Sequence, residues 1–212
     1  MEHFKNNRSI IDYLNSFESS TLNCQQLTLT QNEYIITRYE KSEYLYLLTN
    51  GLASVEILED SNNYISAFIF ENDFFGLDSF SSFPTKNHAI KVISSSAEIV
   101  KIKKDFLLNA LNQKPELYKL LLTNFADIFQ RHYYFFNFLS LPPVERVKTT
   151  LLYLSDFISV PNETSHLEIP REITQQIVAR FCRTSQSRVS ICLRKLHETG
   201  FLLTKTAPFI IN

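Results

Sequence analysis

The residues whose types and spacing are best suited to chemistry lie near the carboxyl end of this 212-residue chain. One face of the segment 185–196 repeats apolar residues at helical spacing, namely Val189, Cys192, Leu193 and Leu196. The other side is polar and cationic, and its residues are Ser185, Gln186, Ser187, Arg188, Ser190, Ile191 and Arg194. A helix that packs by one side and presents such groups on the other can lie in the major groove of DNA, where base edges are read. The segment therefore predicts a recognition helix.

The flanking residues predict the rest of a winged helix-turn-helix. A preceding helix is marked by Ile173, Ile177 and Val178. It ends near Arg183, and the hydroxyl of Thr184 or Ser185 can cap the next helix by accepting a free backbone N–H. Gly200 ends that second helix, and the chain from 202 to 211 predicts a short hairpin, or wing.

Charge is distributed unevenly along the chain. The net charge is −1, yet residues 171–205 hold seven Lys and Arg against two acidic residues, giving +5 there and −6 elsewhere. A basic module on an acidic body can be held against a polyanion while the body is repelled from it. A solvated basic face explains the same charges equally well.

The elements in front of this module change character twice. Residues 6–18 predict a short helix, and short runs of alternating residues from about Gln25 to Ile102 predict a β-sandwich or barrel. Asn50-Gly51 lies between two such runs and predicts a hairpin, because both residues tolerate positive φ.

A long helix follows the strands and begins near Pro115. A heptad seam runs along it through Tyr118, Leu121, Phe125, Ile128, His132, Phe135 and Leu139. A second stripe lies beside the seam at Leu122, Phe129 and Phe136. We expect the seam to meet the same helix of a second chain and the stripe to cover the chain's own barrel, although both can pack internally.

Leu141-Pro142-Pro143 ends the long helix, because proline removes a donor and clashes with the preceding turn. Residues 144–158 predict a further helix. The predicted domains are therefore a barrel at 1–112, a dimerisation helix at 113–140 and a winged helix-turn-helix at 141–212.

Composition excludes several classes. Apolar residues make up 44 %, which indicates a folded globular protein. No apolar run approaches the roughly 18 residues of a membrane span, and the first residues do not resemble a signal peptide. Three cysteines suit free thiols in a reducing compartment, so we expect a cytoplasmic protein.

At this point the chain resembles the cyclic-AMP receptor protein/Fnr (Crp/Fnr) family of bacterial transcription regulators over nearly its whole length. The order of elements matches, and the three glycines, Gly51, Gly76 and Gly200, fall where the family has them. The motifs are Asp73-Phe74-Phe75-Gly76, Val144-Glu145-Arg146-Val147 and Leu196-His197-Glu198-Thr199-Gly200. Further matches in the helix-turn-helix are Ala179, Ser185, Val189 and Leu193.

The resemblance implies an α+β fold. It consists of an N-terminal double-stranded β-helix, or jelly-roll, of the cyclic-nucleotide-binding type, then a long dimerisation helix and a C-terminal winged helix-turn-helix. It also implies a homodimer that binds a palindromic operator in double-stranded DNA and contacts RNA polymerase.

Departures from the family pattern concern the effector. The loop that would hold it includes Phe74 and Gly76, and Leu77, Asn87 and His88 stand where cyclic-nucleotide binders present Glu, Arg and Ser or Thr. A leucine cannot accept the ribose hydroxyl bond, and a neutral asparagine cannot supply the cation that a buried phosphate needs. We therefore expect no cyclic AMP. A single cysteine in the barrel, Cys24, argues against an Fe–S cluster, and nothing supports haem binding.

Departures also concern the DNA-reading residues. Arg183 stands where the turn commonly has Gly, so the turn must differ or carry strain. The family's base-reading positions align with Gln186, Ser187 and Ile191. Gln186 can bond an adenine edge and Ile191 can pack on a thymine methyl, which predicts an A·T-weighted palindrome. Arg188 and Arg194 are expected on phosphates.

Two other functions are alternatives to DNA binding. A ligand-sensing adaptor would use the helical domain to bind a protein, but the basic helix face argues against it. A metal-dependent barrel enzyme needs clustered ligands on neighbouring strands, whereas the five histidines are scattered and no catalytic motif is present. We therefore expect no enzyme activity and no metal.

Overall fold

The computed structural model describes residues 7–37, 43–58, 63–82, 88–163 and 165–212. The chain divides into two compact units. The first unit comprises Met1–Glu59 and Phe68–Arg131, and the second comprises Asp60–Ala67 and His132–Asn212. No helix in the described ranges combines the length and apolar character that crossing a membrane requires.

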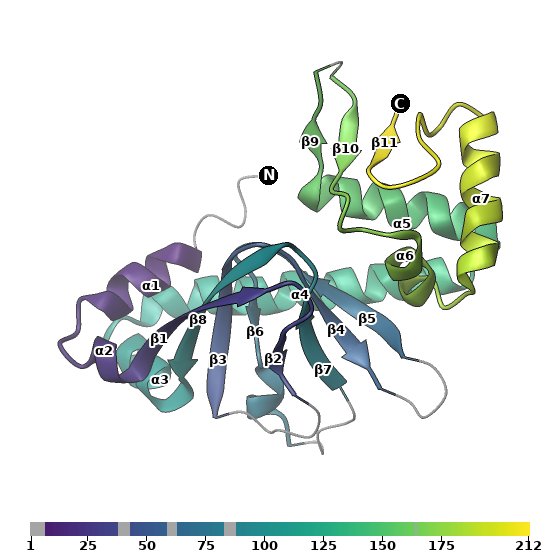
Figure 1. Cartoon of the computed structure of the whole chain (residues 1–212). Coiled ribbons are helices and arrows are strands. Elements are labelled where there is room, and N and C mark those ends of the chain that lie inside the picture. Colours follow the sequence, from purple (N-terminus) through teal and green to yellow (C-terminus); the bar gives the residue numbers. More distant parts are fainter. Residues whose placement is uncertain (1–6, 38–42, 59–62, 83–87, 164) are drawn as a thin grey trace. The chain divides into compact units, whose positions relative to one another are not determined.

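Two four-stranded antiparallel sheets form the predicted jelly-roll (Figure 1). The strands of one sheet are, in spatial order, β1 (Cys24–Thr30), β8 (Ser96–Lys103), β3 (Tyr44–Asn50) and β6 (Phe74–Phe75). Those of the other are β2 (Tyr34–Ile36), β7 (His88–Val92), β4 (Ala53–Ile57) and β5 (Tyr64–Ile69). Side chains that alternate along the strands fill the space between the sheets, among them Leu48, Ile90 and Ile99. The strands expected from the alternating pattern are thus confirmed.

The hairpin expected at Asn50-Gly51 is wrong. β3 pairs with β8 and β6, whereas β4 pairs with β7, so the chain crosses from one sheet to the other at this point. Gly51 has φ 102°, and a Cβ there would lie 2.7 Å from both Ser94 Oγ and the Ser96 carbonyl oxygen. Glycine is therefore required by the close approach of two backbones, not by a two-residue turn.

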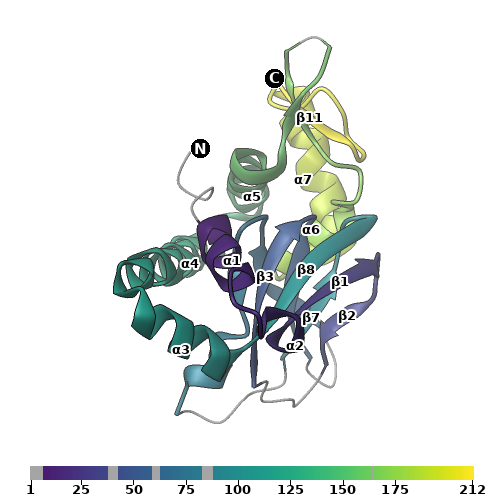
Figure 2. The same cartoon turned by 90° about the vertical axis from the view of Figure 1, so that its left-hand side faces the viewer.

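Two short helices and the start of the long helix cover the outer face of the β3–β8 sheet (Figure 2). The two short helices are α1 (Arg8–Asn15) and α3 (Lys104–Gln113), and the single turn α2 (Ser20–Asn23) connects α1 to β1. Ile10 and Leu14 of α1 and Leu107 of α3 are fully buried, and they pack with Leu45 and Phe74 of the sheet. This cluster is a second core, and it fixes the helices on the roll by burial of apolar surface.

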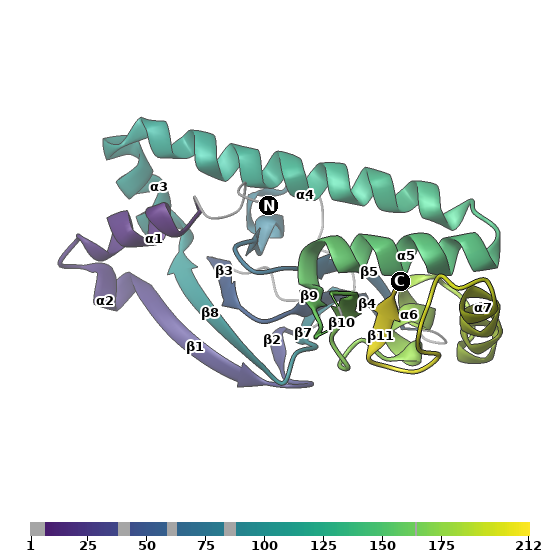
Figure 3. The ribbon, with the colours of Figure 1, turned by 90° about the horizontal axis from the view of Figure 1, so that it is seen from above.

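The long helix α4 (Tyr118–Leu139) follows the 3-10 turn η3 (Pro115–Leu117) as one unbroken helix (Figure 3). Its two apolar stripes are buried differently from the expectation. Leu121 and Phe135 of the seam are only 3 % and 5 % exposed within their own chain. Leu122, Phe129 and Phe136 of the second stripe are 62 %, 58 % and 63 % exposed. The exposed apolar face of α4 is therefore the second stripe.

The second unit contains the winged helix-turn-helix. Its helices are α5 (Pro143–Ile158), α6 (Gln175–Phe181) and α7 (Gln186–Glu198). A three-stranded sheet accompanies them, in the order β11 (Phe209–Ile211), β10 (Leu167–Ile169) and β9 (Val160–Pro161) (Figure 3). Val147, Leu151 and Leu154 of α5 are buried, and Ile158, which continues the same helical spacing, is half-buried. Pro143 lies in the first turn of α5, where its missing N–H breaks no helical bond.

Candidate nucleic-acid interface

Helix α7 has one buried and one exposed side, as the sequence predicts. Val189, Cys192, Leu193 and Leu196 are each at most 3 % exposed. The polar side is open to solvent at Ser185, Gln186, Ser187, Arg188, Ile191 and Arg194, and Ser190 is half-buried at its edge. Ile191 is 48 % exposed, so its side chain can contact an apolar group of a partner such as a thymine methyl.

The two arginines of the exposed side are available to an external ligand. Within the residues that the structure describes, the guanidinium groups of Arg188 and Arg194 make no hydrogen bond or ion pair. A solvated guanidinium loses little on meeting a phosphate, because it has no internal partner to give up. The exposed side of α7 can therefore offer two cations together with two groups suited to base edges, Gln186 and Ile191.

The start of α7 is fixed by a side-chain cap. Ser185 Oγ accepts the Arg188 backbone N–H at 3.2 Å, which satisfies one of the free donors of the first turn. The sequence left Thr184 and Ser185 as alternatives, and the structure selects Ser185. An N-cap serine is worth about 1 kcal/mol to a helix. The cap places Gln186 and Ser187 at the first turn, the part of a recognition helix that contacts bases.

The turn between α6 and α7 keeps its tight shape despite lacking glycine. Arg183 adopts the left-handed conformation with φ 49°, and the next N–H, of Thr184, donates to the Ala179 carbonyl at 3.0 Å. A residue with a Cβ pays about 1–2 kcal/mol for this conformation. Of the two outcomes expected for this position, strain is therefore the one observed. The Arg183 guanidinium lies 4.4 Å from the centroid of the Tyr64 ring, which belongs to the same unit.

Arg146 of α5 supports the same turn from the inside. Its Nη1 donates to the Cys182 carbonyl at 3.0 Å, and its Nη2 donates to the Leu141 carbonyl at 2.9 Å. These bonds satisfy carbonyls left open at the end of α6 and in the connection before α5. From the sequence, Arg146 was identified only as part of a family motif, because no local pattern predicts a bond to a residue 36 positions away.

One side-chain bond ties the wing to α6, and each of these two parts is also held by a bond of its own. Thr174 Oγ1 caps α6 by accepting the Ile177 N–H, and Gln175 Nε2 donates to the Lys205 carbonyl at 3.1 Å. The Leu203 N–H donates to the Ile210 carbonyl at 2.9 Å, so 202–211 forms the expected hairpin, with only Phe209–Ile211 long enough to count as a strand. Lys205 is thereby held at the tip of the wing, exposed beside the start of α6.

Cys182 is an inert core residue of this unit. It is fully buried, and its Sγ lies 3.3 Å from Thr150 Oγ1. Burial raises the pKa of the Cys182 thiol to about 11, so the group stays a neutral thiol at physiological pH. Burial also raises the pKa of Cys192, on the packed side of α7. These two cysteines therefore act as small apolar side chains.

Two of the residues expected to form an effector loop, Phe74 and Leu77, pack in or against the second core. Phe74 is fully buried, Gly76 has φ 84°, and Leu77 packs against the second core, while His88 is half-buried on β7. Asn87 lies outside the described residues. Inside the roll, the ring of Phe75 stacks on Tyr46 at 5.1 Å, and a Cβ on Gly76 would lie 3.0 Å from Tyr46. The first turn after β6 is thus packed against the protein itself.

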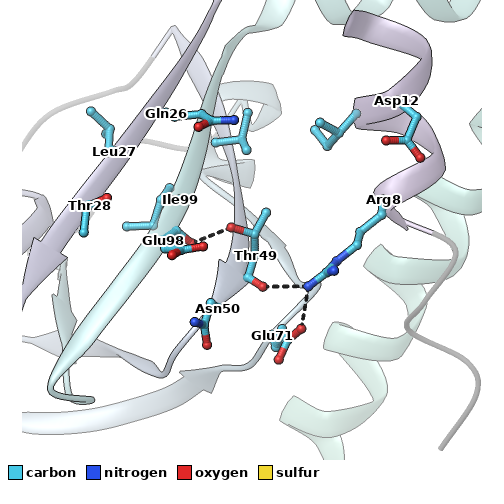
Figure 4. Close-up of a pocket in the computed structure, with 12 residues that line it drawn as sticks. Arg8, Asp12, Gln26, Leu27, Thr28, Thr49, Asn50, Glu71, Glu98 and Ile99 are labelled. Atoms are coloured by element: carbon cyan, nitrogen blue, oxygen red, sulfur yellow. Dashed lines mark hydrogen bonds and ion pairs between the residues drawn. The ribbon is translucent and has the colours of Figure 1, made fainter.

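A separate cavity of about 620 Å³ opens between α1 and the outer face of the β3–β8 sheet (Figure 4). Arg8 extends into it, with Nη2 3.0 Å from the Thr49 carbonyl and 2.7 Å from Glu71 Oε1. Asp12 and Glu98 face the same space. Phe74, Gly76, Leu77 and His88, the described residues of the expected effector loop, do not line this cavity. Among the described residues, no group of three or more His, Cys, Asp and Glu is arranged to hold a metal ion.

Comparison with known proteins supports one architecture. No model of a protein family matches the chain, and no curated protein matches it. The solved structure of a cyclic nucleotide-binding domain containing protein from Listeria monocytogenes is 35 % identical, covers 98 % of this chain and 97 % of its own, and superposes with a TM-score of 0.88.

Two more distant structures share the fold. FixK2 from Bradyrhizobium japonicum is 22 % identical, with 89 % and 91 % of the two chains covered and a TM-score of 0.74. TTHA1359, a CRP/FNR-family transcriptional regulator from Thermus thermophilus, is 14 % identical, with 89 % and 93 % covered and a TM-score of 0.69.

Proposed function

Because this chain belongs to the Crp/Fnr family of transcription regulators, we propose that it is a homodimeric, sequence-specific DNA-binding regulator. The observation that carries the proposal is the exposed side of α7. There, Gln186, Ser187 and Ile191 stand beside the cations of Arg188 and Arg194, which have no partner among the described residues, on a helix whose other side is buried. An adaptor surface for a protein partner would not need this density of free positive charge.

The side chains of α7 divide into reading and positioning groups. Gln186 can make a bidentate contact with adenine, and Ile191 can cover a thymine methyl. Arg188 and Arg194 would contact phosphates, which fixes the helix in the groove without specifying sequence. The proposed operator is therefore a palindrome rich in A·T pairs, with two half-sites about one helical turn apart.

The dimer surface that we propose is the exposed face of α4. Leu122, Phe129, Tyr133 and Phe136 recur along one side of the helix, each between 57 % and 63 % exposed. An apolar stripe of this length on one chain is best explained by burial against a copy of itself. The seam residues Tyr118, Phe125, Ile128 and Leu139 are half-buried, and His132 is exposed beside the stripe. Phe129→Glu should place a charge in this interface and yield a monomer in analytical ultracentrifugation.

A contact with RNA polymerase is the remaining part of the proposal. Val160 of β9 and Leu167 of β10 are 62 % and 40 % exposed on the wing sheet, on elements that do not belong to the helix-turn-helix. We propose this surface for the polymerase. Val160→Glu should lower transcription from a bound promoter in vitro and leave the affinity for DNA unchanged.

Selection from a random duplex pool tests the central proposal. We expect a palindromic, A·T-weighted consensus bound by two copies of the chain. The variant Gln186→Ala should relax the preference at one symmetric pair of positions, and each lost base contact should cost about 1–3 kcal/mol of discrimination. A G·C-rich consensus would contradict the assignment of Ile191, and absence of any selected sequence would contradict DNA reading itself.

A further inference from the structure

The inner face of α4 carries two polar residues that hold the loop between β5 and β6. Asn124 Oδ1 accepts the Phe74 backbone N–H at 3.0 Å. Arg131 Nη2 donates to Asp73 Oδ1 at 2.8 Å. Asn124 and Arg131 are seven residues apart, which places them on the same side of a helix, two turns from each other. All four residues belong to the first unit.

These contacts are buried. Asn124 is 2 % exposed, and the side chains of Arg131 and Asp73 are 11 % and 2 % exposed. Asp73 Oδ2 also accepts the Phe70 N–H at 2.9 Å, so its carboxylate closes the turn and meets α4 at the same time. Buried, charge-assisted bonds of this kind have one good geometry, and sliding the helix would break both.

This loop leads into β6, and Gly76 and Leu77, which directly follow β6, were expected to bind an effector. We propose that Asn124 and Arg131 are positioning residues that lock α4 onto this loop, so that the dimer helix is held for DNA binding without any small molecule. The inference rests on the proposed function and decides one part of it, namely that the free protein is already competent.

The cost of the ion pair supports a positional role. Burial raises the pKa of the Asp73 carboxyl, against the opposing effects of the Arg131 charge and the Phe70 N–H. A charge that is expensive to bury adds little net stability, and a neutral pair of similar shape is often as stable or more so. We therefore read the pair as fixing the register of α4 and not as a stabilising contact.

The test measures DNA binding by the purified full-length chain with no added ligand. Asn124→Ala and Arg131→Gln should each lower specific affinity about ten-fold, because each leaves a buried partner unsatisfied in the locked arrangement. Binding to non-specific DNA should stay the same. Gln130→Ala, an exposed residue on the same helix, is the matched control and should have no effect.

A double variant separates position from stability. Asp73→Asn with Arg131→Gln replaces the ion pair by two amides that can still bond each other, and it should restore most of the specific affinity of Arg131→Gln. Thermal unfolding shows whether each variant is folded. If Arg131→Gln does not fold, Asn124→Ala and the double variant still decide.

Three results would overturn the inference. Wild-type protein that binds its selected operator only after a cell extract of small molecules is added would show that an effector sets the helix. A folded Asn124→Ala variant with wild-type specific affinity would show that the contact of Asn124 with this loop does not affect DNA binding. A double variant that stays as weak as Arg131→Gln would show that the charges, and not the register, matter. Wild-type protein that binds no duplex under any condition would instead contradict the proposed function.

Discussion

Arginines have opposite roles in two regions of the molecule. Arg131 lies against the roll, 11 % exposed, with its charge committed to Asp73. Arg188 and Arg194 stand on the open side of α7, and their guanidinium groups make no hydrogen bond or ion pair in the described part of the chain. The first arginine fixes one element on another, and the other two are free for an outside polyanion. Burial, more than residue type, therefore decides whether an arginine pairs within the protein or is available to a binding partner.

The largest expected effect comes from breaking the buried pair. Arg131→Met leaves the Asp73 carboxylate buried without a counter-charge, which should cost about 3–5 kcal/mol of unfolding free energy. Arg194→Met removes an exposed and unpaired charge, so its cost should stay within about 0.5 kcal/mol. Urea denaturation of both variants measures the difference. Equal costs would erase the distinction between the two regions.

The second expected effect concerns DNA binding by the exposed arginines of α7. Arg188→Ala and Arg194→Ala should each weaken binding to all sequences alike and reduce the salt slope of log K by about one unit. Fluorescence anisotropy over a range of salt concentrations measures both quantities. A variant that altered the consensus without altering the slope would assign its arginine to bases instead of phosphates.

An arginine of intermediate character gives a third effect. Arg183 is exposed, but its backbone has φ 49°. Both Arg183→Gly and Arg183→Ala remove the side-chain contact, and only glycine removes the penalty of a Cβ. The glycine variant should therefore be more stable than the alanine variant by about 1 kcal/mol. Thermal unfolding of the pair checks this, and a more stable alanine variant would refute left-handed strain in the turn.

The smallest effect is a pH dependence of the buried pair. Because burial raises the pKa of Asp73 in the folded state, the folded protein binds more protons than the unfolded chain between the ordinary and the raised value. The contribution of Asp73 to stability should thus fall as pH rises through that window. The unfolding free energy of wild-type protein, compared with the Asp73→Asn, Arg131→Gln variant, should decline with increasing pH. A rise would mean that the ion pair outweighs the burial.

The winged helix-turn-helix was the part best predicted from sequence. Its helices carry buried residues at regular spacing, and a single hydroxyl at Ser185 marks the start of α7. These signals are local, so the chain's order is enough to place them. The alternating pattern predicted a β-sandwich or barrel, and the family resemblance implied a jelly-roll. Neither gave the strand pairing, because β3 and β8 join residues some fifty positions apart. The hairpin at Gly51 failed for that reason.

The lock on α4 could not be predicted, although one signal was present. Asn124 and Arg131 interrupt an otherwise apolar side of the helix at a separation of seven residues, but this pattern alone names no partner for either side chain. Their partners lie 50 and 58 residues away, in a turn that local sequence does not place. Burial along α4 differs from the expectation for its two stripes for a related reason. Periodicity defines a stripe but does not say which side the roll covers.

The most direct measurement is the affinity of ligand-free wild-type protein for its selected palindrome, set against a scrambled duplex of equal length. The account predicts binding of one dimer per palindrome, at least about a thousand-fold tighter than to the scrambled duplex at moderate salt. Equal affinity for both duplexes, or a chain that stays monomeric at the concentrations of the assay, would contradict it.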